Sequence, residues 1–462
     1  MSDFLEKIIE FAGGYDMFPE TGLLVTCVSG GADSMCLLEA LLEISRRYGF
    51  EVCAAHYNHR LRAEESDRDE TFVREYCSVR GVPFFSGSGD VRDHAARNGL
   101  GIEEAARDMR YGFFFEVAEK TGAVRIATAH TADDNTETIL LNFTRGAGTA
   151  GLSGIPPKRG LLIRPMLRLT REDVLVFGEE RNIPYVEDSS NSLDVFARNK
   201  LRHNVIPVLR GINPRLNEAA AATAAILRAD ESYFAQVTEE FVNGKLRVES
   251  GRPGAGSGAG VSASADELLL QPFSVSSRVI RFICGGSLSY EHVMAVLGLC
   301  RRKTASDSLS LPGMTVYREY GRIVFVSGQI TGADGFEPIC PEEGSSVVIP
   351  GTGLNISCIS VICGDTINKS FTSFLFKYID LCGKISVRPR LEGDVISFYG
   401  QNGTKTLKKA FIEHRIPVRK RALIPVVADD NGVLAVYGLG RGNRAVPGPG
   451  DRALQITFDE TT

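Results

Sequence analysis

Strand and helix patterns alternate along residues 1–210, and this alternation limits the fold more than any other feature. Short apolar runs stand at 23–28, 52–55, 82–85 and 124–128, and helical patterns follow at 35–47, 67–80, 102–119 and 133–145. Such alternation predicts right-handed crossovers and a parallel sheet covered by helices on both faces. Ligands of these sheets bind beyond the carboxyl ends of the strands. Ser29, His56 and His130 each follow a predicted strand, so we expect one crevice to collect them.

The pattern changes after Asn213-Pro214. Residues 216–242 are Ala-rich and helical, helical patterns return near 272–284 and 289–302, β-type runs dominate from 306 to 400, and a helix is expected at 407–414. We therefore expect an α/β protein: a doubly wound parallel sheet, a helical middle domain and a small mixed α+β C-terminal domain. The predicted boundaries are 1–212, 213–330, a linker or β segment at 331–374, and 375–462.

Composition excludes several classes of protein. The 462 residues carry a net charge of −5 and are 43% hydrophobic, which is typical of a folded multidomain chain. No apolar run approaches the ~18 residues of a spanning helix, and the first residues do not resemble a signal peptide, so we expect a cytoplasmic protein with no membrane partner. The ten cysteines include no C-x-x-C pair, which argues against zinc, iron–sulfur ligation and a disulfide framework.

A glycine-rich turn between the first strand and the first helix is the most informative string. Its residues are Ser29, Gly30, Gly31, Ala32, Asp33 and Ser34. Small residues let backbone N–H groups approach phosphate oxygens, and the helix that follows adds a favourable dipole. Asp33 would repel phosphate, so we predict a Mg²⁺ ion between them. The alternative is a turn whose Ser or Asp only caps the helix.

A second glycine string, at 146–151, matches G-x-G-x-x-G. The dinucleotide fingerprint must follow a strand and open a helix, whereas the segment before this string is helical. The string therefore fails as a dinucleotide site, and a loop beside the crevice is the better interpretation.

Charged residues near two predicted helix starts are candidates for catalysis. Asp133, Asp134 and Glu137 share roughly one helical face, where carboxylates hold Mg²⁺ or a substrate ammonium, or simply cap the helix. Arg110 is placed to neutralise charge at an α-phosphate or to bind a carboxylate. The alternative for that helix is a solvated pair between Glu103 and Arg107.

Two basic islands in this acidic chain predict binding of a polyanion. Residues 141–215 hold 12 Lys or Arg against 7 Asp or Glu, and residues 384–421 hold 10 against 3. The loop after the second strand adds side chains suited to bases and phosphates. The alternatives are a polar loop and a solvated surface. The candidate RNA contacts are His56, Asn58, His59, Arg62, Arg198, Arg202, Lys405, Lys408, Lys409 and Arg415.

The string SGGADS resembles the signature of the PP-loop ATP pyrophosphatases, which cleave ATP between its α- and β-phosphates. Further strings resemble the tRNA(Ile)-lysidine synthetase family: HYNHRLR at 56–62, EEAARDMRYGFF at 103–114, TAHTADDNTET at 128–138, RGAGTAGLSG at 145–154, FARNKLRHNVIP at 196–207 and GTKTLKKAFIEHRIPVRKRALIPVV at 403–427. The resemblance covers the first 215 residues almost continuously, together with part of the last hundred.

The resemblance implies ligation of free L-lysine to C2 of the wobble cytidine in the CAU anticodon of tRNA(Ile). ATP adenylates O2 of the base first, and the product, lysidine, reads AUA codons. In this scheme Asp33 and Asp133 would hold Mg²⁺, Asp134 and Glu137 would position the lysine ammonium, and Arg110 would offset charge at the adenylate. The middle and C-terminal domains would bind tRNA, and a homodimer is compatible with the scheme.

Two other functions share some of these features. A tRNA thiolase would also adenylate its substrate, but it needs a catalytic cysteine or a C-x-x-C relay, and Cys53 and Cys77 provide neither. A non-catalytic RNA-binding protein could retain the glycine turn, but it would have no need for both the turn and the acidic helix start.

Overall fold

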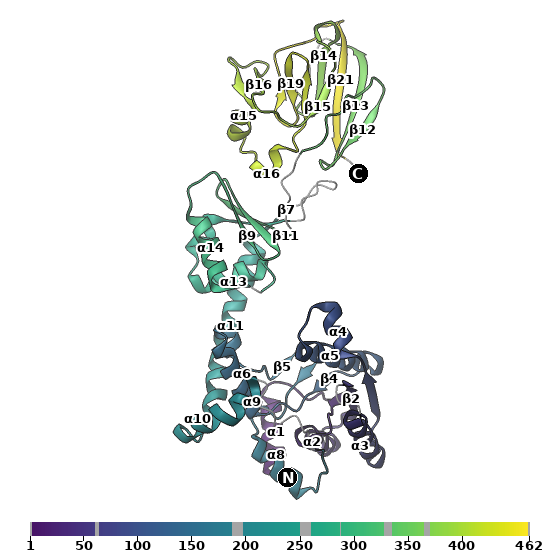
Figure 1. Cartoon of the computed structure of the whole chain (residues 1–462), viewed down its shortest axis with the longest axis vertical. Helices are drawn as coiled ribbons and strands as arrows, with labels where there is room; N and C mark the ends of the chain where they lie inside the picture. Colours follow the sequence, from purple (N-terminus) through teal and green to yellow (C-terminus); the bar gives the residue numbers. More distant parts are fainter. Residues whose placement is uncertain are drawn as a thin grey trace. The chain divides into compact units, whose positions relative to one another are not determined.

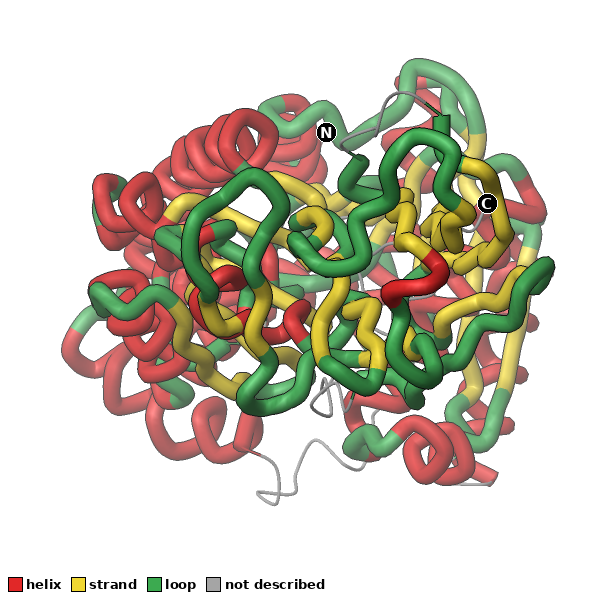
Figure 2. Tube along the Cα trace, turned by 90° about the horizontal axis from the view of Figure 1, so that it is seen from above, coloured by secondary structure: helices red, strands yellow, loops and turns green. Residues whose placement is uncertain are grey.

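The computed structural model describes residues 2–60, 64–186, 197–249, 260–286, 288–327, 335–364 and 370–460. The chain divides into two compact units, 1–233 and 234–462 (Figure 1). This division falls inside one long helix rather than at the predicted boundary near 212. No helix in the described ranges is long and apolar enough to cross a membrane. Figure 2 distinguishes the helices, strands and loops along the trace.

A six-stranded sheet forms the centre of the first unit. Its strands are β1 (Leu23–Cys27), β2 (Glu51–Asn58), β3 (Phe84–Ser88), β4 (Arg125–Ala127), β5 (Lys158–Arg159) and β6 (Leu162–Ile163). The order is β3-β2-β1-β4-β6-β5, and all neighbours are parallel except β5 and β6. The predicted doubly wound sheet is confirmed. The chain leaves β1 in one direction to β2 and β3 and returns on the other side at β4, so the strand order reverses between β1 and β4, where such sheets bind ligands.

Helices cover both faces of this sheet because successive strand residues point to opposite sides. The helices are α1 (Asp3–Gly13), α2 (Ala32–Tyr48), α3 (Glu64–Arg80), α4 (Val91–Asn98), α5 (Ile102–Thr121), α6 (Ala132–Thr144), α7 (Thr149–Leu152), α8 (Arg171–Glu180), α9 (Ala197–Lys200) and α10 (Ile206–Ile212). On one face Leu24 packs in a core with side chains of α1, α2, α3 and α8. On the other face Val25 packs with Phe114 and Val117 of α5. Figure 1 shows α5 on one side of the strands and α2 and α3 on the other.

The second unit begins within α11 (Leu216–Lys245). It continues with α12 (Ala265–Leu270), α13 (Phe273–Ile283) and α14 (Tyr290–Arg301), which confirm the helical middle region. These helices share a core with a five-stranded antiparallel sheet. The strands of this sheet, in spatial order, are β7 (Arg247–Glu249), β8 (Gly260–Ser264), β11 (Arg322–Ser327), β10 (Met314–Glu319) and β9 (Ser306–Leu311).

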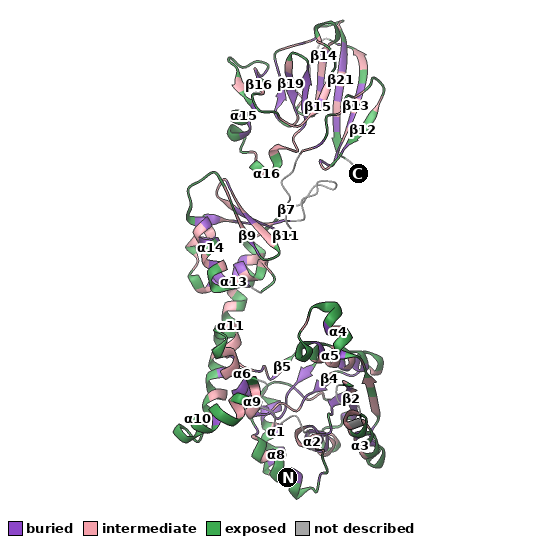
Figure 3. Cartoon of the chain, in the orientation of Figure 1, coloured by how far each residue is buried: buried purple, intermediate pink, exposed green. Residues whose placement is uncertain are grey.

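Antiparallel strands dominate the last part of the chain, and many residues of these strands are buried (Figure 3). The strands here are β12 (Ser346–Ile349), β13 (Leu354–Ile362), β14 (Ser373–Lys377), β15 (Ser386–Arg388), β16 (Val395–Ile396), β17 (Lys405–Thr406), β18 (Val426–Asp429), β19 (Gly432–Val436), β20 (Gly440–Arg441) and β21 (Arg452–Glu460), with helices α15 (Leu407–Glu413) and α16 (Val418–Arg421). The segment 331–374, expected to be a linker or β structure, contributes β12 and β13 to the same sheet as β21. The pairing of β13 with β21 runs from Leu354↔Glu460 to Ile362↔Arg452.

Candidate active site

One cavity of about 370 Å³ in the first unit brings together the acids that the sequence singled out and Arg202, whereas Arg110 and Arg198 are not among the residues that line it. It is lined by Asp33, Thr131, Asp133, Asp134, Glu137, Thr170, Arg171, Glu172, Arg202, Ile206, Arg210, Pro214, Arg215, Asn217 and Glu218. Asp33 comes from the glycine turn after β1, and the three acids of α6 come from the segment after β4. Because β1 and β4 are neighbours in the sheet, these two segments meet at its carboxyl edge.

The glycine turn is held in shape by its own serines. Ser34 Oγ accepts a hydrogen bond from Ser29 N at 3.1 Å and donates one to Gly31 O at 2.9 Å. Gly30 has a φ of 94°, a left-handed conformation that favours glycine. The turn leads directly into α2, which starts at Ala32. This arrangement suits a phosphate group at the start of the helix.

Asp33 lies in a position that calls for a cation. Its Oδ1 atom is buried and has no hydrogen-bond partner. Burial raises the pKa of Asp33 to about 6; Arg171 opposes this rise, and Asp134 adds to it. A desolvated carboxylate without a partner is costly in free energy, so a bound metal ion would relieve this side chain.

The first turn of α6 uses its acids in two ways. Asp134 completes a capping box: Thr131 N donates to Asp134 Oδ2 at 2.9 Å, and Asp134 N donates to Thr131 Oγ1 at 3.5 Å. Asp133 Oδ2 accepts a hydrogen bond from Arg171 N at 2.8 Å, and Oδ1 forms an ion pair with Arg210. The acids at this helix start therefore have both of the roles that the sequence allowed: Asp134 caps the helix, and Asp133 and Asp134 line the cavity.

Glu137 lies deeper, with 1% of its surface exposed. Arg202 Nε donates to its Oε1 at 2.6 Å, whereas its Oε2 is buried and has no partner. Burial raises the pKa of Glu137, and the guanidinium of Arg202 opposes the rise. Arg202 also approaches Asp134 Oδ1 at 3.8 Å. The nearby Arg198 donates to Thr138 Oγ1 at 3.0 Å.

Both arginines belong to the helical run that passes from α9 into α10. Residues Leu201–Val205 of this run form a π-helical turn, just before Pro207. Proline lacks the N–H that an α-helical turn would need there, so the wider turn suits this point of the chain. Arg210, further along the run, is a cavity residue that sequence reasoning missed, although it lies in the first basic island.

The candidate RNA contacts His56 and Asn58 belong to the end of β2 rather than to a loop after it, and both are buried in the first unit. His56 is 5% exposed, with Nδ1 at 2.9 Å from Val28 O, and Asn58 is 3% exposed and donates to Asp67 Oδ1 at 2.9 Å. Burial lowers the pKa of His59 to about 4, with Arg110 contributing. Arg62 lies outside the described residues. A contact of His56 or Asn58 with RNA stays a prediction, and their burial means that it would need these side chains to be uncovered.

Some side chains of the second basic island are exposed, and others form ion pairs with carboxylates of the protein. Lys408 and Lys409 of α15 are exposed, as is Arg415, whereas Lys405 forms an ion pair with Glu413 at 2.8 Å. Arg419 is engaged with Glu319 at the end of β10, at 2.7 and 3.3 Å. The exposed members are therefore the ones available to a polyanion.

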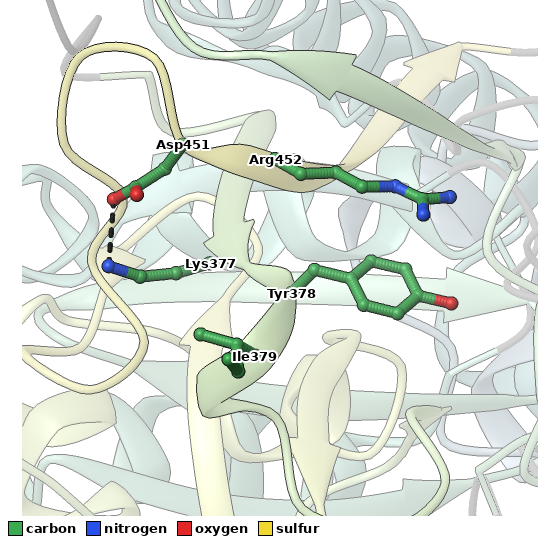
Figure 4. Close-up of a pocket in the computed structure, with 5 residues that line it drawn as sticks. All are labelled: Lys377, Tyr378, Ile379, Asp451 and Arg452. Atoms are coloured by element: carbon green, nitrogen blue, oxygen red, sulfur yellow. Dashed lines mark ion pairs between the residues drawn. The ribbon is translucent and has the colours of Figure 1, made fainter.

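A second cavity, of about 330 Å³, lies in the C-terminal part and is lined by Lys377, Tyr378, Ile379, Asp451 and Arg452 (Figure 4). Its charged side chains interact with other side chains that line the same cavity. Lys377 pairs with Asp451 at 3.0 Å, and the Arg452 guanidinium lies 4.7 Å from the centre of the Tyr378 ring. Unlike the first cavity, it contains no unpartnered carboxylate, so we do not place catalysis here.

Comparisons with known proteins agree with this geometry. The family profile described as a PP-loop domain matches residues 5–209, and the TilS substrate C-terminal domain matches residues 385–457. A tRNA(Ile)-lysidine synthase of Bacillus licheniformis is 32% identical over 94% of this chain and 92% of its own length. The chain belongs to the tRNA(Ile)-lysidine synthase family.

A second tRNA(Ile)-lysidine synthase, from Caldanaerobacter subterraneus subsp. tengcongensis, is 30% identical over 94% of this chain and 93% of its own length. Among solved structures, the U34-tRNA thiolase NcsA of Methanococcus maripaludis, with its [4Fe-4S] cluster, overlaps 49% of this chain and 79% of its own, at 16% identity and a TM-score of 0.42. That score is too low to carry an argument. Membership of the synthase family confirms that the PP-loop domain uses ATP.

The cysteines of this family member do not resemble a sulfur relay. All ten are free, and Cys53 and Cys77 are buried. Burial raises the pKa of Cys53 to about 12 and that of Cys77 to about 11, so both stay protonated thiols at neutral pH. Within the described part of the chain, no group of three or more His, Cys, Asp or Glu side chains is arranged to hold a metal ion.

Proposed function

We propose that this chain joins the ε-amine of L-lysine to C2 of the wobble cytidine in the CAU anticodon of tRNA(Ile), with ATP as the activating co-substrate. The observation that carries the proposal is the shared cavity, in which Asp33 of the phosphate turn meets Asp133 and Glu137 of α6. A cleft of this kind can hold a nucleotide phosphate, a cation and an amine together. The name of the relatives, tRNA(Ile)-lysidine synthase, gives the acceptor and the product.

The chemistry explains why ATP is needed. The O2 atom of cytosine is a poor leaving group, but an oxygen bonded to the α-phosphorus of AMP departs readily. O2 attacks the α-phosphorus and pyrophosphate leaves; the neutral lysine amine then attacks C2, and AMP leaves with the oxygen. The residues that bind these groups need only to align them and to accept a proton from the amine.

Mg²⁺ would be held by Asp33 and Asp133. The unpartnered Asp33 Oδ1 fits a hard cation, whereas Asp133 would have to exchange its ion pair with Arg210 for the ion. Two carboxylates do not complete a magnesium shell, so phosphate oxygens and water would supply the rest. The ion would neutralise phosphate charge as the pyrophosphate departs.

The lysine ammonium would lie between Asp134 and Glu137. Glu137 Oε2 supports this role because it is buried and unpartnered while Oε1 is fixed by Arg202. The raised pKa of Glu137 also makes this carboxylate a better proton acceptor for the attacking amine. Asp134 offers Oδ1, since its Oδ2 is used by the capping box.

The remaining cations would bind the tRNA and the adenylate. Arg110 would offset charge at the adenylate, and Arg198 and Arg202 would hold the cytidine or neighbouring phosphates. The middle region 213–330 and the C-terminal region 375–462 would bind the rest of the tRNA, with Lys408 and Lys409 gripping its acceptor stem. The reaction would take place in the cytoplasm, and a homodimer is compatible with it.

Digestion of the product tRNA to nucleosides tests this function. The full-length chain would be incubated with ATP, isotopically labelled lysine and a tRNA(Ile) transcript carrying CAU. We expect mass spectrometry to find labelled lysidine, with one AMP and one pyrophosphate for each lysine incorporated. Sulfur in the nucleoside, or AMP formation that does not depend on lysine or tRNA, would contradict the proposal.

A further inference from the structure

Three arginines gather around one tyrosine outside the acidic cavity. Arg107 Nη2 donates to the Tyr111 hydroxyl at 3.4 Å, and its guanidinium carbon lies 4.7 Å from the ring centre. The guanidinium carbon of Arg110 lies 6.0 Å from the same ring, and Arg164 is close enough to Tyr111 for the tyrosine to counter the lowering of the Arg164 pKa by burial. We call Arg107, Arg110, Arg164 and Tyr111 the Tyr111 arginine cluster.

This cluster has an excess of positive charge. Within the described residues, none of its three arginines forms an ion pair with a carboxylate, whereas Arg202 and Arg210 of the acidic cavity both do. Arg164 is 4% exposed, its Nη1 donates to Pro156 O at 2.6 Å, and its Nε is buried without a partner. A buried guanidinium that lacks a counter-charge costs free energy, so an anion bound at this cluster would be stabilised.

The place of the cluster in the sheet indicates which anion it meets. Arg164 directly follows β6, and Arg107 and Arg110 lie near the start of α5, so the cluster lies at the carboxyl edge of the sheet. His130 lies between β4 and the acidic start of α6; burial lowers its pKa to about 4, and Arg164 and Arg107 contribute. However, α5 packs on the face of the sheet opposite to α2. The triphosphate at the start of α2 would therefore be held elsewhere.

We propose that Arg107 and Arg164 of the Tyr111 arginine cluster bind a backbone phosphate of the tRNA next to the target cytidine, while Arg110 keeps its role at the adenylate. This inference rests on the proposed function and deepens it. A base can reach a buried reaction site only when its flanking backbone is held, and arginine forks match phosphate oxygens in a bidentate manner. Phosphate contacts of this kind fix the register of the RNA without reading its sequence.

Arg107→Ala is the first test, because Arg107 is exposed and its loss should not disturb folding. Arg97→Ala is the matched control, since Arg97 is also exposed but pairs with Asp93 on the neighbouring helix α4. Binding of the tRNA(Ile) transcript would be measured between about 50 and 200 mM salt. We expect Arg107→Ala to weaken binding roughly tenfold and to lower the salt slope by about one, and Arg97→Ala to change neither. The affinity for ATP should be unchanged in both variants.

A modified RNA then locates the contact. A synthetic anticodon stem–loop would carry an uncharged methylphosphonate in place of the phosphate on one side of the target cytidine, or on the other. We expect one of these two RNAs to bind the wild-type chain more weakly, and Arg107→Ala to show no further loss with that same RNA, because the two changes remove one interaction.

Three outcomes would overturn the inference. A lower affinity for ATP with an unchanged salt slope for tRNA would assign the cluster to the nucleotide's phosphates. Unchanged binding of both ligands, or additive losses with the methylphosphonate RNA, would leave it a structural feature. Failure of the proposed function is seen separately, because the wild-type chain would then form no lysidine even if the RNA-binding results agree with the inference.

Discussion

Arg202 Nε donates to Glu137 Oε1 at 2.6 Å, so a carboxylate that is only 1% exposed carries a guanidinium on one oxygen and no partner on the other. The pair holds this carboxylate in place, and Glu137 lines the same cavity as Asp33. A lysine ammonium bound there would complete the coordination of Glu137, with Arg202 acting as the group that positions it.

Glu137→Gln should therefore impair the lysine step more than the ATP step. The amide keeps the size of the side chain but can neither balance an ammonium nor accept its proton, so we expect lysidine formation to fall about 10²-fold or more. Pyrophosphate release with ATP and tRNA alone should persist. Steady-state assays at varied lysine would measure the change, and Glu116→Gln, an exposed partner of Lys120, is the control. An unaltered dependence on lysine would remove Glu137 from this role.

Asp33→Asn should abolish pyrophosphate release and yet stabilise the ligand-free protein. The folded pKa of Asp33 is about 6, above its ordinary value of 3.8, so the ionised side chain destabilises the fold. This penalty is absent below about pH 4, develops as the pH rises to about 6, and is complete above it. Its size is roughly 3 kcal/mol.

Thermal melts of the two chains at several pH values would check this sign. The wild-type chain should lose stability relative to Asp33→Asn between pH 4 and 6 and remain less stable at pH 8. Addition of Mg²⁺ and ATP should reverse the order, because only the wild type gains from binding the ion. A melting temperature that falls in the variant at pH 8 without ligands would show that Asp33 has a stabilising partner.

The sequence was sufficient to predict that the phosphate turn and the acidic helix meet. Strand–helix alternation placed both Asp33 and Asp133 at carboxyl ends of strands, and parallel strands present these ends at one edge. The partners of these acids were not predictable in the same way. Arg210 lies 77 residues from Asp133, and which face of its helix turns toward the cavity depends on packing.

The pairing of strands that lie far apart in the sequence was not predictable either. Nothing local in residues 354–362 indicates that β13 pairs with the last strand of the chain, since a strand's partner is set by tertiary contacts. Arg164 was missed because a single arginine after a two-residue strand has no motif. Its burial and its unpartnered Nε, which make it informative, are visible only in three dimensions.

Replacing Lys408 and Lys409 by Ala should weaken tRNA binding and spare ATP binding. Both are exposed on α15, so their charges are available to phosphates, and we expect the salt slope to fall by about two. Lys405→Ala should have a smaller effect because Lys405 already pairs with Glu413. Filter binding of the tRNA(Ile) transcript would measure the affinity of the chain that lacks Lys408 and Lys409 and that of Lys405→Ala. An equal loss in Lys405→Ala would show that the whole island contributes irrespective of its internal pairs.

Arg419 belongs to the same basic island, but we expect it to stabilise the fold rather than to bind RNA. Its side chain is 10% exposed and that of Glu319 is 8% exposed, and Glu319 accepts two hydrogen bonds from it. Glu319→Gln replaces the carboxylate that accepts both of these hydrogen bonds by a neutral amide in a buried place, so we expect the free energy of unfolding of the second unit to fall by about 3 kcal/mol. Glu413→Gln, which breaks the more exposed pair with Lys405, should cost much less than Glu319→Gln because solvent screens that pair. Urea unfolding followed by hydrogen exchange in β10 and α16 would measure both. Equal midpoints for the two variants would place Arg419 with the RNA-binding cations instead.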